Sequence, residues 1–317
     1  MPRLSKRWPQ TFLLPALALI VLVFAFVGGP DYYSPRSFQL AWNLGHVVAF
    51  MLWACLCLLY FQSLARLSLV RQFALFALAA AIFGALIEIV QSQLGRQASW
   101  YDLLSDILGS LLAVSLLSAQ RRQIKTALRI LIQTVLIMTV VVLHRGFFIA
   151  LLDDYYARRQ FPVLADFSAP FELSRWGGDA AGQLLHIPDN RTVLALKVLL
   201  ITDLYSGVGL KHAPANWQGY SFLRLRLYNP AEDELLITCR IHDKQHTQGD
   251  QVYSDRFNRR IRLSPGWNTV QISLQDIIDA PTSRKMDITR INGLGIFSTR
   301  LQQVRTLFIS EIKLTRQ

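Results

Sequence analysis

The sequence predicts two folds in one chain: a bundle of membrane-spanning α-helices followed by an all-β jelly-roll sandwich. Hydrophobic residues make up 52% of the 317 residues and charged residues only 17%, which is more apolar than an ordinary soluble protein. The apolar runs lie before residue 152, whereas charged and turn-forming residues are frequent after it. We therefore expect a transmembrane domain over 1–152, a connector over 153–163 and a sandwich over 164–317.

Five apolar stretches are long enough to cross a bilayer, because about 20 apolar residues span roughly 30 Å of hydrocarbon. They cover residues 12–27, 40–61, 72–91, 101–117 and 127–143. Basic residues precede the first stretch, but no small-residue cleavage pattern follows it. We therefore expect an uncleaved anchor rather than a signal peptide.

The basic residues of the membrane half lie mainly in alternate loops, which predicts the orientation of the chain. They precede the first stretch and lie between the second and third and between the fourth and fifth: Arg3, Lys6, Arg7, Arg66, Arg71, Arg121, Arg122 and Lys125. The positive-inside rule then places the N-terminus in the cytoplasm. Five crossings place the sandwich outside, so we expect a multi-pass protein of the bacterial inner membrane with an extracytoplasmic C-terminal domain.

Polar side chains within these helices predict a site in the outer half of the membrane. A carboxylate near the bilayer centre costs about 2.5–3.5 kcal/mol, so it usually has a partner or a function. The helix ends that the topology brings together carry His46, Glu88, Gln91, Arg96, Ser99, Asp102 and Asp106. This mixture favours a ligand-binding or proton-handling site, and the alternative is that the charges neutralise one another and hold a helical hairpin.

The same residues closely resemble the VanZ-like membrane family over about residues 12–120. The family has Glu-x-x-Gln, a loop Arg followed by Ser, and Asp-x-x-x-Asn-x-x-Gly, which correspond to Glu88, Gln91, Arg96, Ser99, Asp102, Asp106 and Gly109. His46 matches the family's histidine in the preceding helix. The chain differs in having Trp42-Asn43 for Asp-Lys and Asp106 for Asn. The resemblance implies an envelope protein, because the founding members are associated with resistance to glycopeptide antibiotics, and it implies no established reaction.

The second half has the pattern of a β-sandwich. Short alternating segments are separated by turn signals such as Asn229-Pro230 and Ser264-Pro265-Gly266. The predicted strands are 192–200, 221–228, 235–241, 259–263, 268–272, 293–297 and 306–314. Many short strands with little helical periodicity are typical of a sandwich or jelly roll.

The order of aromatic residues before these strands resembles the galactose-binding-like jelly roll of many carbohydrate-binding modules. It is carried by Trp217-Gln-Gly-Tyr220 and Pro265-Gly-Trp267-Asn268. The resemblance implies that the sandwich binds a glycan. Aromatic rings can cover the apolar side of a sugar while charged planar groups bind its hydroxyls. The candidate glycan contacts are Trp217, Asp243, Tyr253 and Arg256.

Several other classes of function are not predicted. The net charge of +12 lies largely in the membrane loops, so we expect no nucleic-acid partner. His242 and His246 are four residues apart, but the segment reads as a strand running into a loop, so we predict no metal site. No cofactor is predicted, although related sandwiches hold structural calcium. No nucleophile elbow, phosphate loop or zinc-protease motif is found, so a non-enzymatic protein is favoured.

The leading interpretation is a cell-envelope membrane protein with an outward-facing polar site and a sandwich that binds a glycan or another partner. It links the chain to glycopeptide resistance or surface polysaccharide. One alternative is an intramembrane enzyme acting on a lipid-linked envelope sugar, with Glu88 or Asp102 as general base, His46 as proton carrier and Arg96 holding a phosphate or carboxylate. Another is a scaffold that binds a second envelope protein. The expected partners are membrane lipid and a glycan, a lipid-linked sugar or a second protein. The sequence does not predict the oligomeric state.

Overall fold

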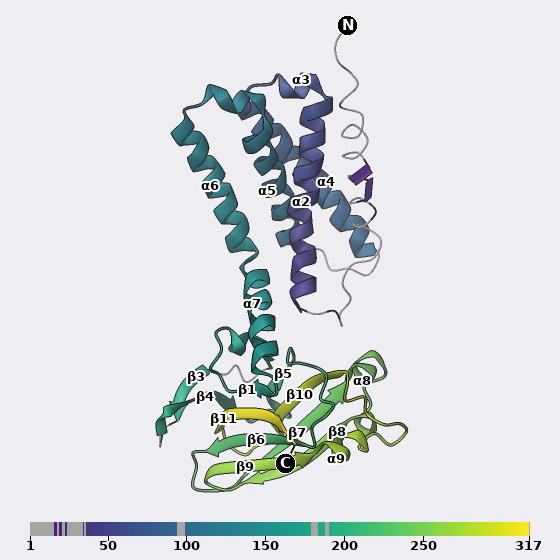
Figure 1. The fold of residues 1–317 in the computed structure, drawn as a ribbon, viewed down its shortest axis with the longest axis vertical. Coiled ribbons are helices and arrows are strands. Elements are labelled where there is room, and N and C mark those ends of the chain that lie inside the picture. Colours follow the sequence, from purple (N-terminus) through teal and green to yellow (C-terminus); the bar gives the residue numbers. More distant parts are fainter. Residues whose placement is uncertain are drawn as a thin grey trace. The chain divides into compact units, whose positions relative to one another are not determined.

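The computed structural model describes residues 34, 36–93, 99–178, 183–187 and 190–316, with a few isolated positions before residue 34. The chain divides into two compact units, Met1–Phe148 and Ile149–Gln317. The first is helical and the second is built mainly from strands (Figure 1). We describe each unit by itself.

The first unit contains four helices that are long and apolar enough to cross a membrane, counted over the described residues. They are α2 (Arg36–Tyr60), α4 (Leu69–Gln93), α5 (Trp100–Leu117) and α6 (Thr126–Leu143), with the short α3 (Gln62–Ala65) and the 3-10 helix η1 (Ala119–Gln123) between them. These four coincide with the second to fifth predicted spans. The first predicted span, 12–27, lies almost entirely outside the described residues, so the expected count of five becomes four in the described part.

Helix α5 packs between α2 and α4 and is the most buried of the spans. The approach to α2 is close, because a Cβ atom added at Gly109 would lie only 2.2 Å from the carbonyl oxygen of Val47. Small residues allow helices to approach in this way inside a membrane. The buried side of α5 also carries Ser105 and Asp106, so this packing brings polar groups of α5 against the neighbouring helices.

Helix α7 (Arg145–Gln160) follows α6 almost directly, and from Ile149 onward it belongs to the second unit. The predicted connector, 153–163, therefore begins within a helix. Its Asp153 is buried and accepts hydrogen bonds from Arg175 Nε at 2.9 and 3.0 Å to the two carboxylate oxygens. Arg175 also donates to the carbonyl of Leu164 at 3.2 Å, so this guanidinium joins α7 to the sandwich.

The second unit is a sandwich of two antiparallel sheets, which confirms the predicted sandwich. One sheet has the order β3-β4-β11-β6-β9, with β1 pairing to β11, and the other has the order β2-β5-β10-β7-β8. The strands are β1 (Val163–Ala165), β2 (Trp176–Gly177), β3 (Gln183–Ile187), β4 (Asn190–Leu200), β5 (Ser206–Leu210), β6 (Phe222–Asn229), β7 (Leu235–Asp243), β8 (Phe257–Leu263), β9 (Gly266–Ser273), β10 (Ile291–Ser298) and β11 (Arg305–Thr315). Short helices lie between strands: η2 (Glu172–Arg175), α8 (Lys244–Gln248), η3 (Tyr253–Asp255) and α9 (Leu274–Ile278).

The core lies between the two sheets and follows the alternation of the strands. In β7, Leu235, Ile237, Cys239 and Ile241 are buried, so the residues between them lie on the outer side of the five-stranded sheet. Burial of each such aliphatic side chain contributes roughly 1.5–3 kcal/mol. Burial also raises the pKa of the free Cys239 thiol to about 12, which leaves this sulfur unreactive at neutral pH.

Candidate functional site

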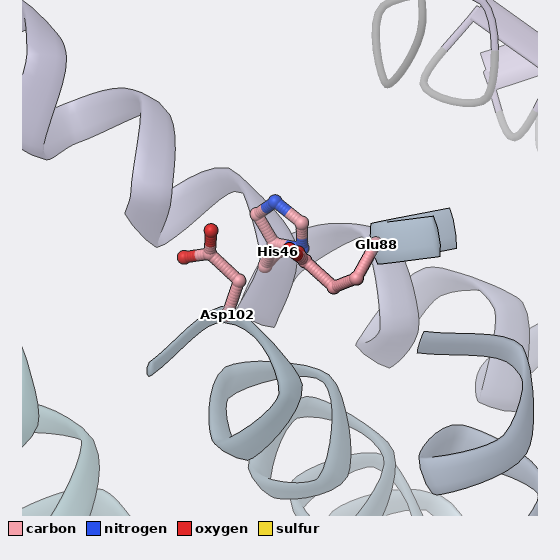
Figure 2. A group of neighbouring side chains, drawn as sticks. All are labelled: His46, Glu88 and Asp102. Atoms are coloured by element: carbon pink, nitrogen blue, oxygen red, sulfur yellow. The ribbon is translucent and has the colours of Figure 1, made fainter. Parts of the chain in front are cut away.

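The first candidate site lies among the helices of the first unit. His46 on α2, Glu88 on α4 and Asp102 on α5 point toward one another, and one possible ligand atom from each lies within 4.8 Å of the others (Figure 2). We call these three residues the helix site. The structure therefore brings together side chains that the sequence predicted to converge from three separate spans.

Asp106 supports the helix site from the next turn of α5. Its side chain is fully buried, and its Oδ1 atom lies 2.9 Å from Nδ1 of His46. The backbone N–H of Ser99 donates to Oε2 of Glu88 at 2.9 Å, so Ser99 contributes its main chain. Gln91 is buried one turn beyond Glu88 on α4. Arg96 lies outside the described residues.

A further polar contact in this unit was missed by the sequence analysis. The hydroxyl of Ser105 donates to the carbonyl of Tyr101 at 2.7 Å and lies 3.1 Å from Nε2 of His144. Both Ser105 and His144 are buried. A single serine and a histidine at the end of a span carry no spacing signal, so only the packing of α5 against α6 reveals this pair. The roles proposed for the membrane residues stay predictions.

Two of the predicted glycan contacts in the sandwich are buried, which corrects those assignments. Trp217 is only 1% exposed, and its indole N–H donates to the carbonyl of Pro214 at 3.0 Å. A ring enclosed in the core offers no face to a sugar. The side chain of Asp243 is also fully buried, because it forms the hydrogen-bonding centre of a loop cluster beneath the surface.

This loop cluster is an ion-pair network. Arg284 donates to Asp243 at 2.5 and 2.8 Å and to Asp255 at 2.6 and 2.9 Å. Burial pushes the pKa of Asp243 upward, but hydrogen bonds from Arg284 and from the backbone N–H groups of His246 and Asp287 outweigh it and lower that pKa. The hydrogen bond from Arg284 likewise lowers the pKa of Asp255. The network therefore holds the loop in place, and Asp243 is engaged in it rather than presented to a ligand.

The second candidate site is on the outer side of the five-stranded sheet. Arg240 and His242 alternate there with the buried residues of β7, and Asn258 of β8 pairs directly with Arg240. Arg256 precedes β8 and lies close enough to lower the pKa values of both Arg240 and His242. We call Arg240, His242, Arg256 and Asn258 the arginine face.

Glycines of the neighbouring strand make room for these side chains. Gly293 and Gly295 of β10 pair with His242 and Arg240. A Cβ atom at Gly293 would lie 2.7 Å from a ring carbon of His242, and one at Gly295 would lie 3.4 Å from Nε of Arg240. The imidazole and the guanidinium therefore lie across β10, over a strand surface without side chains at these two positions.

The arginine face is electropositive. Burial, followed by the charges of Arg240 and its neighbours, lowers the pKa of His242 to about 4. Burial and the charge of Arg256 lower the pKa of Arg240. Neither arginine forms an ion pair with a carboxylate among the described residues. Buried polar atoms without a hydrogen-bond partner there are Nε of Arg240, Nδ1 of His242, Nε of Arg256 and Oδ1 of Asn258.

Aromatic rings flank this face. Tyr253 is 69% exposed, and the Arg256 guanidinium lies over its ring at 5.4 Å. Arg240 lies 5.9 Å from the ring of Phe297, which contacts the 61% exposed ring of Tyr205 at 5.9 Å. Tyr253 and Arg256, both predicted from the sequence, thus lie at the surface together.

The neighbouring histidines differ from the sequence interpretation. His242 and His246 have ring centroids 5.3 Å apart, because β7 passes directly into α8 rather than into an irregular loop. Nδ1 of His246 instead lies 3.2 Å from Asp255, which ties it to the Arg284 network. Among the described residues, this pair does not form part of a group of three possible metal ligands.

No protein-family model and no curated protein sequence matches this chain, so the resemblance of the helices to the VanZ-like family stays a prediction. Among solved structures, the sandwich is similar to a family 11 carbohydrate-binding module from Clostridium thermocellum in complex with a β-1,3-1,4-mixed-linked tetrasaccharide. The identity is 13% and the TM-score 0.37, over 48% of this chain and 94% of that one.

Two further likenesses are of the same strength. A family 28 module described as specific for non-crystalline cellulose is 10% identical, with a TM-score of 0.35 over 49% of this chain and 93% of its own. An exo-β-agarase is 13% identical, with a TM-score of 0.38 over 49% of this chain and 25% of its own. At these TM-scores the likenesses assign neither a family nor a ligand to this chain.

Proposed function

We propose that this chain is a membrane-anchored protein of the bacterial cell envelope whose sandwich binds an acidic glycan on the arginine face. The observation that carries the proposal is the pair Arg240 and Arg256, held side by side without a carboxylate partner among the described residues. The two guanidinium groups repel each other, and a bound anion would offset this repulsion. The face therefore favours a negatively charged ligand.

The chemistry of the face fits a sugar that carries an acidic group. Guanidinium groups bind carboxylate, phosphate and sulfate through paired hydrogen bonds. The exposed ring of Tyr253 supplies an apolar face of the kind that covers a sugar ring. Oδ1 of Asn258 can accept a hydrogen bond from a hydroxyl. The combination therefore supports an acidic polysaccharide over a simple inorganic anion.

The four apolar helices support the anchor in this proposal. We propose the orientation expected from the basic loops, with a cytoplasmic N-terminus and an extracytoplasmic sandwich, because envelope polysaccharides lie on that side of the inner membrane.

Binding can be measured with the full-length protein in detergent micelles. A fluorescently labelled polygalacturonate serves as the acidic probe and labelled dextran as the neutral one. We expect the acidic probe to bind more tightly, and the double variant Arg240→Ala/Arg256→Ala to lose at least about tenfold in affinity, because hydrogen bonds to charged groups are worth roughly 1.5–3 kcal/mol each.

Arg226→Ala is the matched control. Arg226 lies on the outer side of the six-stranded sheet, 4.3 Å from the ring of Trp267, and so offers the same pairing of arginine and aromatic residue on the opposite sheet. Its loss should leave binding unchanged. Equal affinity for both probes, or loss of binding only in Arg226→Ala, would contradict the proposal.

The pH dependence gives a second readout. The pKa of His242 is about 4 in the absence of a ligand. A bound anion stabilises the protonated imidazole, so this pKa should be higher in the complex. By linkage, affinity should then increase as the pH falls from 7 toward 4. Dextran sulfate is the suitable probe, because it stays ionised over this range. His242→Gln should flatten this dependence, and an unchanged pH profile in that variant would exclude a contact between the ligand and His242.

A further inference from the structure

We infer that the helix site holds a divalent transition-metal ion that accepts mixed nitrogen and oxygen donors, such as Zn²⁺ or Mn²⁺, with His46, Glu88 and Asp102 as its ligands. This inference concerns α2, α4 and α5 alone and does not depend on glycan binding by the sandwich. It also revises the sequence analysis, which predicted no metal site.

The distances between the three side chains fit a single ion. One possible ligand atom from each residue lies within 4.8 Å of the other two. Metal–ligand bonds to histidine nitrogen and carboxylate oxygen are about 2.0–2.2 Å, so two atoms on one ion lie at most about 4.4 Å apart. Because the three atoms lie within 4.8 Å of one another, side-chain rotations that shorten these separations would place all three groups at bonding distance from one ion.

Asp106 prepares His46 for this role. Its fully buried carboxylate lies 2.9 Å from Nδ1 of His46, which leaves Nε2 as the nitrogen for a metal. A metal-bound histidine usually donates its other ring N–H to a carboxylate, which fixes the tautomer and makes the ligand more basic. Asp106 therefore acts as a positioning residue beside the three ligands.

The charge of the region points the same way. The carboxylates of Asp102 and Asp106 lie with that of Glu88 in a bundle of apolar helices, where taking a carboxylate out of water costs several kcal/mol. Oδ1 of Asp102 is buried and has no hydrogen-bond partner among the described residues. A dication offsets two of the negative charges and gives this oxygen a partner.

The kind of metal follows from the donors. Imidazole suits zinc, iron, nickel and copper, whereas carboxylates extend the choice to manganese, and sulfur ligands are not part of the site. Three protein ligands leave at least one coordination position open, which is typical of sites that bind water or a substrate rather than purely structural sites.

The test uses the full-length protein, purified in detergent, stripped with a chelator, and incubated with Zn²⁺ or Mn²⁺ before desalting. Metal content is measured by inductively coupled plasma mass spectrometry. We expect about one equivalent in the unmodified protein and little metal in His46→Ala and Asp102→Asn. Asp276→Asn, an exposed carboxylate of the sandwich, is the control and should retain the full amount.

Two further measurements separate ligation from folding. Asp106→Asn should keep the stoichiometry but weaken the affinity about 10- to 100-fold, as loss of an outer-shell carboxylate does. X-ray absorption at the zinc edge of the unmodified protein should show nitrogen and oxygen neighbours without sulfur. The inference would be overturned if the unmodified protein retained neither ion, if the zinc had sulfur neighbours, or if His46→Ala and Asp102→Asn held as much metal as the unmodified protein.

Discussion

Asp243 shows how a residue chosen for its chemistry can serve the fold instead. It follows the outward-facing His242 at the end of β7, where a sequence pattern cannot tell a surface carboxylate from a buried one. The structure pairs it with Arg284, which lies 41 residues further along the chain. That distance in sequence is why the partner could not be predicted, since no local period connects a strand end to a later loop.

Removal of Arg284 should destabilise the sandwich strongly. The side chain of Asp243 is fully buried, so Arg284→Ala would remove the positive charge that compensates it, at a cost of about 3–5 kcal/mol. Thermal melting of the full-length protein, followed by near-ultraviolet circular dichroism, measures the change. Arg290→Ala removes an equally positive but 72% exposed side chain and should cost less than about 1 kcal/mol.

Acid should reveal the same network. Because the pKa values of Asp243 and Asp255 are lowered in the folded state, their contribution is present above the ordinary aspartate pKa and is lost as the pH falls through the folded-state values. Arg284→Ala should therefore show a weaker loss of stability on acidification than the unmodified protein. Parallel acid-melting curves for the two proteins would mean that other carboxylates dominate.

At the scale of single elements, the strands of the core were predictable and the short ones were not. The seven predicted segments coincide with β4 and β6 to β11, each long enough to show alternating burial. The missed strands are β1, β2, β3 and β5, which have two to five residues each. Strands of that length show too few alternations to be separated from loops. This holds even for β3, whose partner β4 is the next strand in the sequence.

Of the four residues of the arginine face, only Arg256 was a candidate glycan contact from the sequence, together with the neighbouring Tyr253. Arg240 lay inside the predicted strand 235–241, and His242 came directly after it. Their alternation with Cys239 and Ile241 could have identified the outer face of the sheet. What the sequence could not supply is the register, which places Gly293 opposite His242.

Helix α5 should tolerate no side chain at Gly109, where it lies against α2. A Cβ atom at Gly109 would meet the Val47 carbonyl oxygen at 2.2 Å, so Gly109→Ala requires the two helices to separate. We expect a lower melting temperature and, because His46 directly precedes Val47 on α2, weaker metal binding at the helix site. Gly45→Ala on α2 is the control, since no atom of the described residues lies within 4 Å of its added carbon. Equal melting temperatures for the two variants would contradict the close packing.

At the scale of the whole molecule, the orientation in the membrane is the prediction with the widest consequences. Ser283 is exposed in the sandwich, and Ser68 is exposed between α3 and α4. We expect a membrane-impermeant maleimide to label Ser283→Cys in spheroplasts and Ser68→Cys only after permeabilisation. Cys55 and Cys57 would be replaced by alanine, whereas the buried Cys239 can stay because its thiol is unreactive. The reverse labelling pattern would place the sandwich in the cytoplasm.

The ion pair between Asp153 and Arg175 determines where a self-sufficient fragment of this protein must begin. A fragment starting at the first strand, β1, would retain Arg175 in the interior but lack its carboxylate. A fragment that begins with the second unit, at Ile149, keeps both partners. The part of α7 from Ile149 onward therefore belongs with the sandwich, and any fusion that replaces the first unit by another must keep that part of the helix.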